Sequence, residues 1–266
     1  MDSLDKLPRM DIKNLVTENC TLVTGGRSPI AVDIAKRVSL NSKVLLLTRD
    51  ASHKDLSHLH SNKNIVIQEA NLLQSSFVSE FELILRKFNV ANLCFAHRLS
   101  SIEYSSTQRF LGEVTRPAEL IESLNSIQRG IQKRVVILTS PASQYVIDDQ
   151  DLTYHINKSS LSTLVKFFAV NFATNNFVIN AVAPGSFVTK ERSKEYYKEH
   201  QLLYQGIISS IPSRKFTSPK DISDFVEFLI HKAPMTLNGT EIVIDSGLTL
   251  IEQSTFARRM SQNYSL

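Results

Sequence analysis

Residues 20–38 read CTLVTGGRSPIAVDIAKRV, and this stretch decides the fold. Its first five residues, Cys20 to Thr24, form a short, mostly apolar run of the kind found in buried strands. A glycine turn follows at Gly25 and Gly26, and the apolar residues after Pro29 recur at helical spacing. A strand, a tight glycine turn and a helix are the opening unit of a dinucleotide-binding fold, whose backbone amides and helix N-terminus attract phosphate.

The rest of the chain continues this alternation of strands and helices. Short apolar runs predict six further strands, at 43–48, 64–68, 91–96, 134–139, 177–182 and 241–244. Helical patterns lie around them, at about 53–61, 72–88, 104–129, 154–173, 190–209 and 219–231. Continuous apolar strands that alternate with helices predict a parallel sheet buried on both faces. We therefore expect an α/β fold: one doubly wound, Rossmann-like sheet of about seven strands with helices on both faces.

The 266 residues are expected to form a single domain with two flanking segments. Residues 1–18 predict an N-terminal arm, residues 19–250 the Rossmann-like domain, with a lid at about 190–209, and residues 251–266 a C-terminal tail. No apolar run approaches the ~18 residues of a membrane span. The N-terminus lacks the apolar core of a secretion signal, so we expect a cytoplasmic protein.

Composition excludes several classes of partner. The formal charge is +4, but the basic residues are scattered rather than gathered with aromatic residues, so we expect no nucleic acid and no membrane as partner. His58 and His60 are two residues apart on a predicted helix and do not share a face, so no metal site is expected. Cys20 and Cys94 fall in predicted strands and are interpreted as buried free thiols.

Tyr154 and Lys158 are four residues apart at the start of the predicted helix 154–173, so their side chains lie one turn apart on one face. A phenol with a pKa near ~10 is a poor acid–base group at neutral pH. An ammonium about one turn away favours the phenolate and makes proton transfer practicable. A Tyr-x-x-x-Lys pattern on its own is more often a solvated helix face, so its context decides.

That context is a series of motifs in a fixed order. Thr24-Gly25 opens the glycine turn, Ser140 follows the fifth strand 14 residues before Tyr154, and residues 180–189 contain Asn-x-x-x-Pro-Gly-x-x-x-Thr. From about residue 19 to 250 the chain resembles the short-chain dehydrogenase/reductase family, as a divergent member similar to 3-oxoacyl-[acyl-carrier-protein] reductases. The resemblance implies an oxidoreductase that reduces a carbonyl to an alcohol, or the reverse, with a nicotinamide cofactor.

The resemblance also implies catalytic roles. Tyr154 is the expected proton donor, Lys158 supports it and holds the nicotinamide ribose, and Ser140 binds the substrate oxygen. Glu113 stands where the family has an Asn that holds a water beside the lysine. As a carboxylate near Lys158 it is expected to raise the pKa of the lysine, unless it is merely exposed.

For the cofactor, the resemblance favours NADP(H) over NAD(H). Thr48 stands where an NAD enzyme has a carboxylate, and Arg49 after it offers a planar fork to a 2′-phosphate. The alternative is that Arg49 starts an exposed loop. The backbone at Phe187 is expected to orient the carboxamide. The residues assigned to the cofactor are Thr24, Gly25, Gly26, Arg27, Ser28, Ile30, Arg49, Asn71, Leu72, Ala96, Tyr154, Lys158, Pro184, Gly185, Phe187 and Thr189.

Besides Glu113, the chain departs from the family at two further places. Pro29 and Ala31 occupy glycine positions of the turn, where proline is tolerated because it falls in the first helical turn. After the fourth strand, His97 and Arg98 end the segment where the family has Asn-Asn-Ala-Gly, so they must turn away or contact the cofactor.

Two hypotheses follow. The first is an NADP(H)-dependent carbonyl reductase for a small-molecule carbonyl or alcohol, with a carrier- or CoA-linked 3-oxoacyl thioester as one candidate. The second is a catalytically impaired relative that binds a cofactor or a partner. The resemblance also implies a homodimer or homotetramer formed through the helices at 104–129 and 154–173. The alternative is that the apolar side of the helix at 154–173 is buried inside the monomer.

Overall fold

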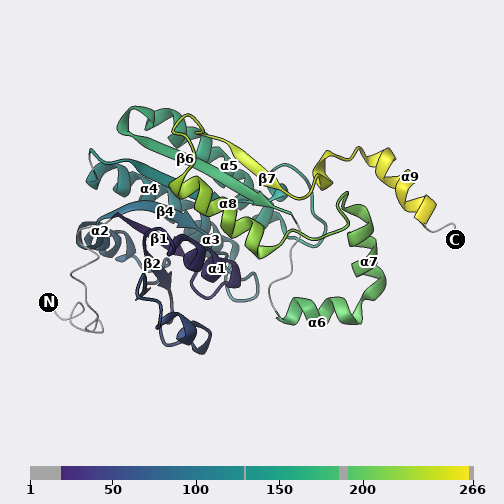
Figure 1. Cartoon of the computed structure of the whole chain (residues 1–266), viewed down its shortest axis with the longest axis horizontal. Coiled ribbons are helices and arrows are strands. Elements are labelled where there is room, and N and C mark those ends of the chain that lie inside the picture. The colour runs from purple at the N-terminus through teal and green to yellow at the C-terminus, as the bar shows by residue number, and fades with distance from the viewer. Residues whose placement is uncertain (1–18, 129, 186–190, 264–266) are drawn as a thin grey trace.

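The computed structural model describes residues 19–128, 130–185 and 191–263. Seven parallel strands form one sheet in the order β3-β2-β1-β4-β5-β6-β7 (Figure 1). The chain order reverses between β1 and β4, and the crevice at such a switch point is where open α/β sheets bind ligands. The expected doubly wound sheet is confirmed. Its strands are β1 Cys20–Thr24, β2 Lys43–Thr48, β3 Ile65–Glu69, β4 Val90–Phe95, β5 Lys133–Leu138, β6 Phe177–Pro184 and β7 Glu241–Ile244.

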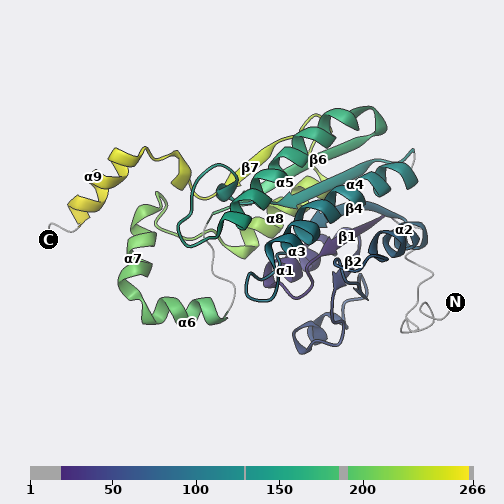
Figure 2. The same cartoon turned by 180° about the vertical axis from the view of Figure 1, so that it is seen from behind.

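Helices cover both faces of the sheet. One apolar core joins the sheet to α2, α4 and α5, which include Phe81, Leu124 and Phe168. A second core joins the other face to α1 and α8, which include Ile34 and Val226. Figure 1 shows α8 in front of the sheet, and Figure 2 shows α4 and α5 in front of it. The helices are α1 Pro29–Val38, α2 Phe77–Phe88, α3 Ser106–Phe110, α4 Arg116–Ile127, α5 Leu152–Asn171, α6 Glu191–Glu199, α7 Gln201–Ser210, α8 Pro219–His231 and α9 Gln253–Asn263.

The helix expected at 72–88 begins only at Phe77, and tertiary hydrogen bonds explain the difference. The guanidinium of Arg116 donates to the backbone oxygens of Leu72 at 2.8 Å and Gln74 at 2.9 Å. These bonds fix the two carbonyls in a turn before the helix. A side chain more than forty residues away along the chain therefore sets this boundary.

The helix expected at 104–129 is interrupted by a π-helical turn at Leu111–Thr115, between α3 and α4. Pro117 accounts for the interruption, since it has no N–H to donate to the carbonyl of Glu113 and its ring crowds that carbonyl. π-turns in helices often lie at functional sites, and this one contains Glu113.

The helices α6 and α7 lie away from the layers around the sheet, as does α9 (Figure 1). They confirm the helical excursion expected at about 190–209, and α9 occupies much of the expected tail. Among the described residues, Tyr197, Tyr204 and Phe216 pack together with ring centroids 5.5–5.9 Å apart. No helix in the described ranges has the length and apolar character needed to span a bilayer.

Candidate active site

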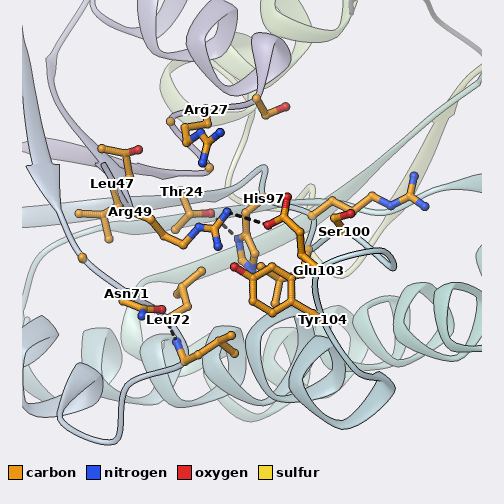
Figure 3. Close-up of a pocket in the computed structure, with 18 of the residues that line it drawn as sticks. Thr24, Arg27, Leu47, Arg49, Asn71, Leu72, His97, Ser100, Glu103 and Tyr104 are labelled. Atoms are coloured by element: carbon orange, nitrogen blue, oxygen red, sulfur yellow. Dashed lines mark hydrogen bonds and ion pairs between the residues drawn. The ribbon is translucent and has the colours of Figure 1, made fainter. Parts of the chain in front are cut away.

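A cavity of about 250 Å³ lies at the carboxyl ends of β1, β2 and β4 (Figure 3). The register places Thr24, the last residue of β1, beside Leu47 of β2 and Phe95 of β4, so the turns after these strands meet there. The cavity therefore occupies the crevice at the switch point. Of the residues expected to hold the cofactor, it is lined by Thr24, Gly25, Gly26, Arg27, Ser28, Arg49, Asn71 and Leu72. Ile30 and Ala96 are buried and are not among its lining residues.

The glycine turn at Gly25–Ser28, the candidate phosphate cradle, leads directly into the N-terminus of α1. Gly25 has φ +93°, and a Cβ there would lie 2.8 Å from the Cα of His97, so only glycine fits. Pro29 begins α1, where its missing N–H removes no helical bond, as expected. Ser28 caps the helix without a side-chain cap bond, and the first turn has no acidic residue. The helix N-terminus therefore remains suited to a phosphate group.

His97 turns inward beside the cradle. Its Nε2 donates to the backbone oxygen of Gly112 at 2.8 Å, since a carbonyl only accepts, and its Nδ1 accepts from the Thr24 hydroxyl at 2.7 Å. Burial lowers the pKa of His97, which favours this neutral form. His97 thus fixes the turn after β4 to the turn after β1.

Arg49 is exposed at the start of the loop after β2, and its side chain is paired across the cavity. Its Nη2 lies 3.4 Å from a carboxylate oxygen of Glu103, and its guanidinium lies 5.2 Å from the ring centroid of Tyr104 (Figure 3). Both partners belong to the segment between β4 and α3, and both line the cavity. The sequence analysis missed them because nothing in that polar segment marks two of its residues as partners of β2.

The three expected catalytic residues are grouped at the end of β5. Lys158 donates from Nζ to the backbone oxygen of Leu138 at 2.8 Å, and Ser140 follows two residues later. Tyr154 lies in the first turn of α5, with its ring centroid 5.7 Å from the same Nζ. Ser140 is buried, and its hydroxyl accepts from the N–H of Ala142 at 3.2 Å. The β5–α5 unit thus brings Ser140, Tyr154 and Lys158 together.

Burial dominates the electrostatics of Lys158. It lowers the pKa of Lys158 from 10.5 to about 8, with Arg98 acting in the same direction. Glu113 acts in the opposite direction and raises the pKa of Lys158, as expected, but the loss of solvation is larger, so the net pKa is lowered. The buried ammonium is therefore close to releasing its proton near neutral pH.

Glu113 is buried rather than exposed, with 3% of its surface accessible. Its carboxylate accepts from the N–H of Leu99 at 2.6 Å and from Nδ2 of Asn157 at 2.8 Å. Asn157 precedes Lys158 on α5, and its Oδ1 is buried without a hydrogen-bond partner in the described structure. The family's Asn position is thus filled by a carboxylate that is tied to the helix of the lysine.

Asp151 and Arg109 fix the start of α5. Asp151 is the N-cap, and its carboxylate accepts from the N–H of Tyr154 at 2.8 Å. The buried guanidinium of Arg109 donates to both oxygens of this carboxylate, at 2.6 and 3.0 Å, and lowers the pKa of Asp151. An Asp directly before a helical pattern is an N-cap signal that could have identified Asp151 from the sequence.

Glu241 on β7 fixes the turn that follows Ser140. Its carboxylate accepts from the hydroxyls of Ser143 at 3.1 Å and Ser162 at 3.0 Å, and from the amide of Gln144 at 3.3 Å. The sequence gives no sign of this contact, because Glu241 is about a hundred residues from the turn that it holds.

The last group of expected cofactor residues lies at the end of β6. Pro184 ends the strand, and the N–H of Gly185 donates to the backbone oxygen of Ile244 at 2.8 Å. A Cβ at Gly185 would lie 2.6 Å from the Cβ of Asp245, so glycine is required there. Phe187 and Thr189, which were also expected to bind the cofactor, lie outside the described residues.

Fold and site together define a Rossmann-like oxidoreductase with a Ser–Tyr–Lys group. The sequence model of the family described as "Enoyl-(Acyl carrier protein) reductase" matches residues 117–249, which is half of the chain. The chain belongs to the short-chain dehydrogenase/reductase family of oxidoreductases.

Named relatives agree with this assignment. A glucose 1-dehydrogenase of Gluconobacter oxydans is 29% identical over 47% of this chain and 46% of its own length. The chain thus matches only about half the length of that relative. A 3-oxoacyl-[acyl-carrier-protein] reductase of Rickettsia typhi is 21% identical over 88% of this chain and 98% of its own length.

Solved structures show the same fold. A 3-oxoacyl-[acyl-carrier protein] reductase from Brucella melitensis superposes with a TM-score of 0.73 at 17% identity, covering 89% of this chain and 99% of its own. The Pseudomonas aeruginosa RhlG complex with NADP superposes with a TM-score of 0.74 at 20% identity, covering 90% and 99%.

Proposed function

We propose that the protein is an NADP(H)-dependent oxidoreductase that interconverts a carbonyl and an alcohol, with Tyr154 as the proton donor. The observation that carries the proposal is the buried Lys158, which is anchored on the Leu138 carbonyl and lies 5.7 Å from the Tyr154 ring. Burying an ammonium has a free-energy cost that a purely structural position would avoid with an apolar residue. Such an arrangement is expected where the charge has a chemical role.

In this mechanism the Tyr154 hydroxyl transfers its proton to the carbonyl oxygen of the substrate. The Lys158 ammonium stabilises the phenolate that remains, and the Ser140 hydroxyl donates to the oxygen as negative charge develops on it. When bound, the nicotinamide cofactor supplies the hydride that reduces the carbonyl carbon. Glu113 positions Lys158 through Asn157.

The described cavity fits the adenosine and phosphate part of such a cofactor. The cradle at Gly25–Ser28 and the N-terminus of α1 suit the pyrophosphate. Arg49 and Arg27 suit a 2′-phosphate, and the amide of Asn71 suits the adenine. By resemblance, Gly185, Phe187 and Thr189 are assigned to the nicotinamide end.

For the substrate, a 3-oxoacyl thioester or a similar ketone is supported by the Rickettsia typhi relative. The helices α6 and α7 are proposed as the lid over the substrate. The second candidate, a catalytically impaired module that binds a cofactor or a partner, is favoured by one observation. His97 packs against Gly25 in the phosphate turn, where the family has a small residue.

Fluorescence titration with NADPH separates the two candidates at the first step. We expect saturable binding below millimolar cofactor, followed by NADPH oxidation with at least one member of a panel of ketones and oxoacyl compounds. Absence of saturable binding at that concentration refutes the enzyme proposal. Binding without turnover on a broad panel favours the impaired module.

Glu103→Gln is expected to strengthen NADPH binding and to leave NADH binding nearly unchanged. Glu103 competes with the 2′-phosphate for Arg49, and its carboxylate also repels that phosphate. An exposed ion pair of this kind corresponds to roughly a two- to fivefold change in affinity. The matched variant Arg49→Gln should weaken NADPH binding roughly tenfold, since it removes a charge-assisted hydrogen bond. Equal effects on the two cofactors would contradict the assignment of Arg49.

The outer face of α5 supports the proposed homodimer or homotetramer. Leu152, Ile156, Phe167 and Val170 are all exposed, and their spacing of 4, 11 and 3 residues places them along one side of the helix. An apolar helix face of this kind is suited to a second copy of the chain.

A double substitution of Phe167 and Val170 by Asp is expected to convert the oligomer to monomers in sedimentation velocity. Two carboxylates cannot be buried without partners in an apolar interface. The control is Leu83→Asp, at an exposed leucine on α2. A wild-type protein that sediments as a monomer would show that this face is not an interface.

A further inference from the structure

Arg98 brings a positive charge onto the expected proton donor. It follows β4, and its guanidinium carbon lies 4.3 Å from the ring centroid of Tyr154. Its Nη2 donates to Oε1 of Gln150 at 2.7 Å. Gln150 directly precedes the N-cap of α5, so Arg98 spans from the turn after β4 to the start of the catalytic helix.

The charge of Arg98 is not neutralised by a carboxylate contact within the described residues. Arg49 and Arg109 each pair with one, Glu103 and Asp151 respectively. The pKa of Asp151 is lowered mainly by Arg109 and to a smaller extent by the Arg98 charge. Both oxygens of this carboxylate already accept from Arg109. The neutral Gln150 takes one of the five donors of the guanidinium, which leaves a planar fork available for an anion.

The Arg98 side chain has contacts both at the cofactor cavity and at the catalytic helix. Arg98 lines the same cavity as the phosphate cradle at Gly25–Ser28, where Arg27 supplies a separate positive charge. The Arg98 guanidinium contacts Gln150, in the segment from β5 to α5 that also contains Ser140. Lys158 cannot bind an anion of the substrate in its place, because its ammonium is buried and donates to the Leu138 carbonyl.

We propose that Arg98 binds a carboxylate of the substrate, so that of the candidate substrates above a ketone that is an oxo acid is reduced in preference to its ester or to a 3-oxoacyl thioester. This inference rests on the proposed carbonyl reduction. Because Arg98 stacks on the ring whose hydroxyl serves the carbonyl, the carboxylate must be only a few bonds from that carbonyl. The carbonyl carbon gains the hydride of NADPH and its oxygen gains the Tyr154 proton. The products are a hydroxy acid with its carboxylate unchanged and NADP⁺.

The test measures NADPH oxidation with matched pairs of substrates. The pairs are 2-oxobutanoate, 3-oxobutanoate and 4-oxopentanoate, each against its methyl ester. We expect at least one acid to exceed its ester in kcat/KM. Arg98→Met is expected to lower that acid-to-ester ratio roughly 10- to 100-fold, mainly through KM of the acid, as for loss of a charge-assisted hydrogen bond. Arg98→Lys should retain part of the ratio, and NADPH affinity serves as the folding control.

Two results would overturn the proposal: esters equal to or better than acids in the wild type, or an unchanged ratio in Arg98→Met. A loss in Arg98→Met that is equal for all substrates and follows NADPH affinity would place Arg98 on the cofactor instead. If the protein binds NADPH but oxidises it with none of the pairs, the proposed carbonyl reduction is refuted for these compounds. That result is distinct from a failure of the role assigned to Arg98. Calorimetric titration of the same pairs into the NADP-loaded protein then decides, since acid binding that depends on Arg98 supports the inference and equal binding refutes it.

Discussion

Tyr154→Phe is expected to lower kcat by about 10³-fold, because general acid catalysis by a positioned side chain contributes on the order of 10² to 10⁴. The substitution removes one hydroxyl and leaves the ring beside Arg98 and Lys158, so the packing of α5 is preserved. Cofactor affinity should therefore change little. The measurement is single-turnover NADPH oxidation with the best substrate, together with NADPH titration of the same preparation.

Tyr145→Phe is the matched control for this prediction. Tyr145 lies in the same connection between β5 and α5, and half of its side chain is exposed to solvent. Its substitution should leave kcat within about twofold, as is usual for exposed positions away from the chemistry. Turnover that persists undiminished in Tyr154→Phe would show that another group donates the proton.

The fold was predictable because most of its seven strands are almost continuous apolar runs, and the inner strands β1, β2, β4, β5 and β6 are buried along nearly their whole length. The predicted helix bounds were wrong where contacts between residues distant in the sequence override the local helical preference. Arg116 bonds two carbonyls that the helical pattern had assigned to α2, and Pro117 interrupts the helix before α4. Periodicity reports which face of a segment is apolar, and it contains no information about such bonds.

The candidate site was predictable where its residues follow the ends of strands. Ser140, Gly25 and Gly185 lie in turns whose position the strand pattern already determines. The contacts that shape their chemistry were not predictable. The bond between Arg98 and Gln150 joins residues 52 apart along the chain, and the bond between Ser143 and Glu241 joins residues 98 apart. From the sequence, Arg98 was recognised only as a departure from the family. The direction of its side chain depends on how the turn after β4 folds.

The burial of Lys158 could also not be predicted from the sequence. From the sequence, Glu113 is expected to raise the pKa of Lys158, and nothing in the sequence indicates how far the lysine is buried. In the folded protein only 6% of Lys158 is accessible, and desolvation outweighs the carboxylate. The same burial that adjusts the lysine for catalysis should therefore make the stability of the protein depend on pH.

Lys158→Met tests this consequence. The folded pKa of about 8 is depressed below the ordinary 10.5, so between these pH values the unfolded chain holds a proton that the folded chain has released. The free energy of unfolding of the wild type should then rise with pH across this window relative to Lys158→Met. The full shift corresponds to a relative gain of about 3 kcal/mol. Turnover of the wild type should fall above pH 8 as the ammonium is lost, and the variant should have kcat lower by roughly 10²-fold or more.

Denaturant unfolding of both proteins across this pH range measures the difference directly, and other titrating groups cancel because they are common to both. Lys166→Met is the control, since Lys166 lies on the same helix two turns further on and is exposed. Its difference from the wild type should stay level with pH. If the Lys158→Met difference is also level, or changes in the opposite direction, the buried ammonium does not have the depressed pKa on which its assigned role depends. A rising difference together with lost turnover would show that one buried charge both destabilises the fold near neutral pH and supports proton transfer by Tyr154.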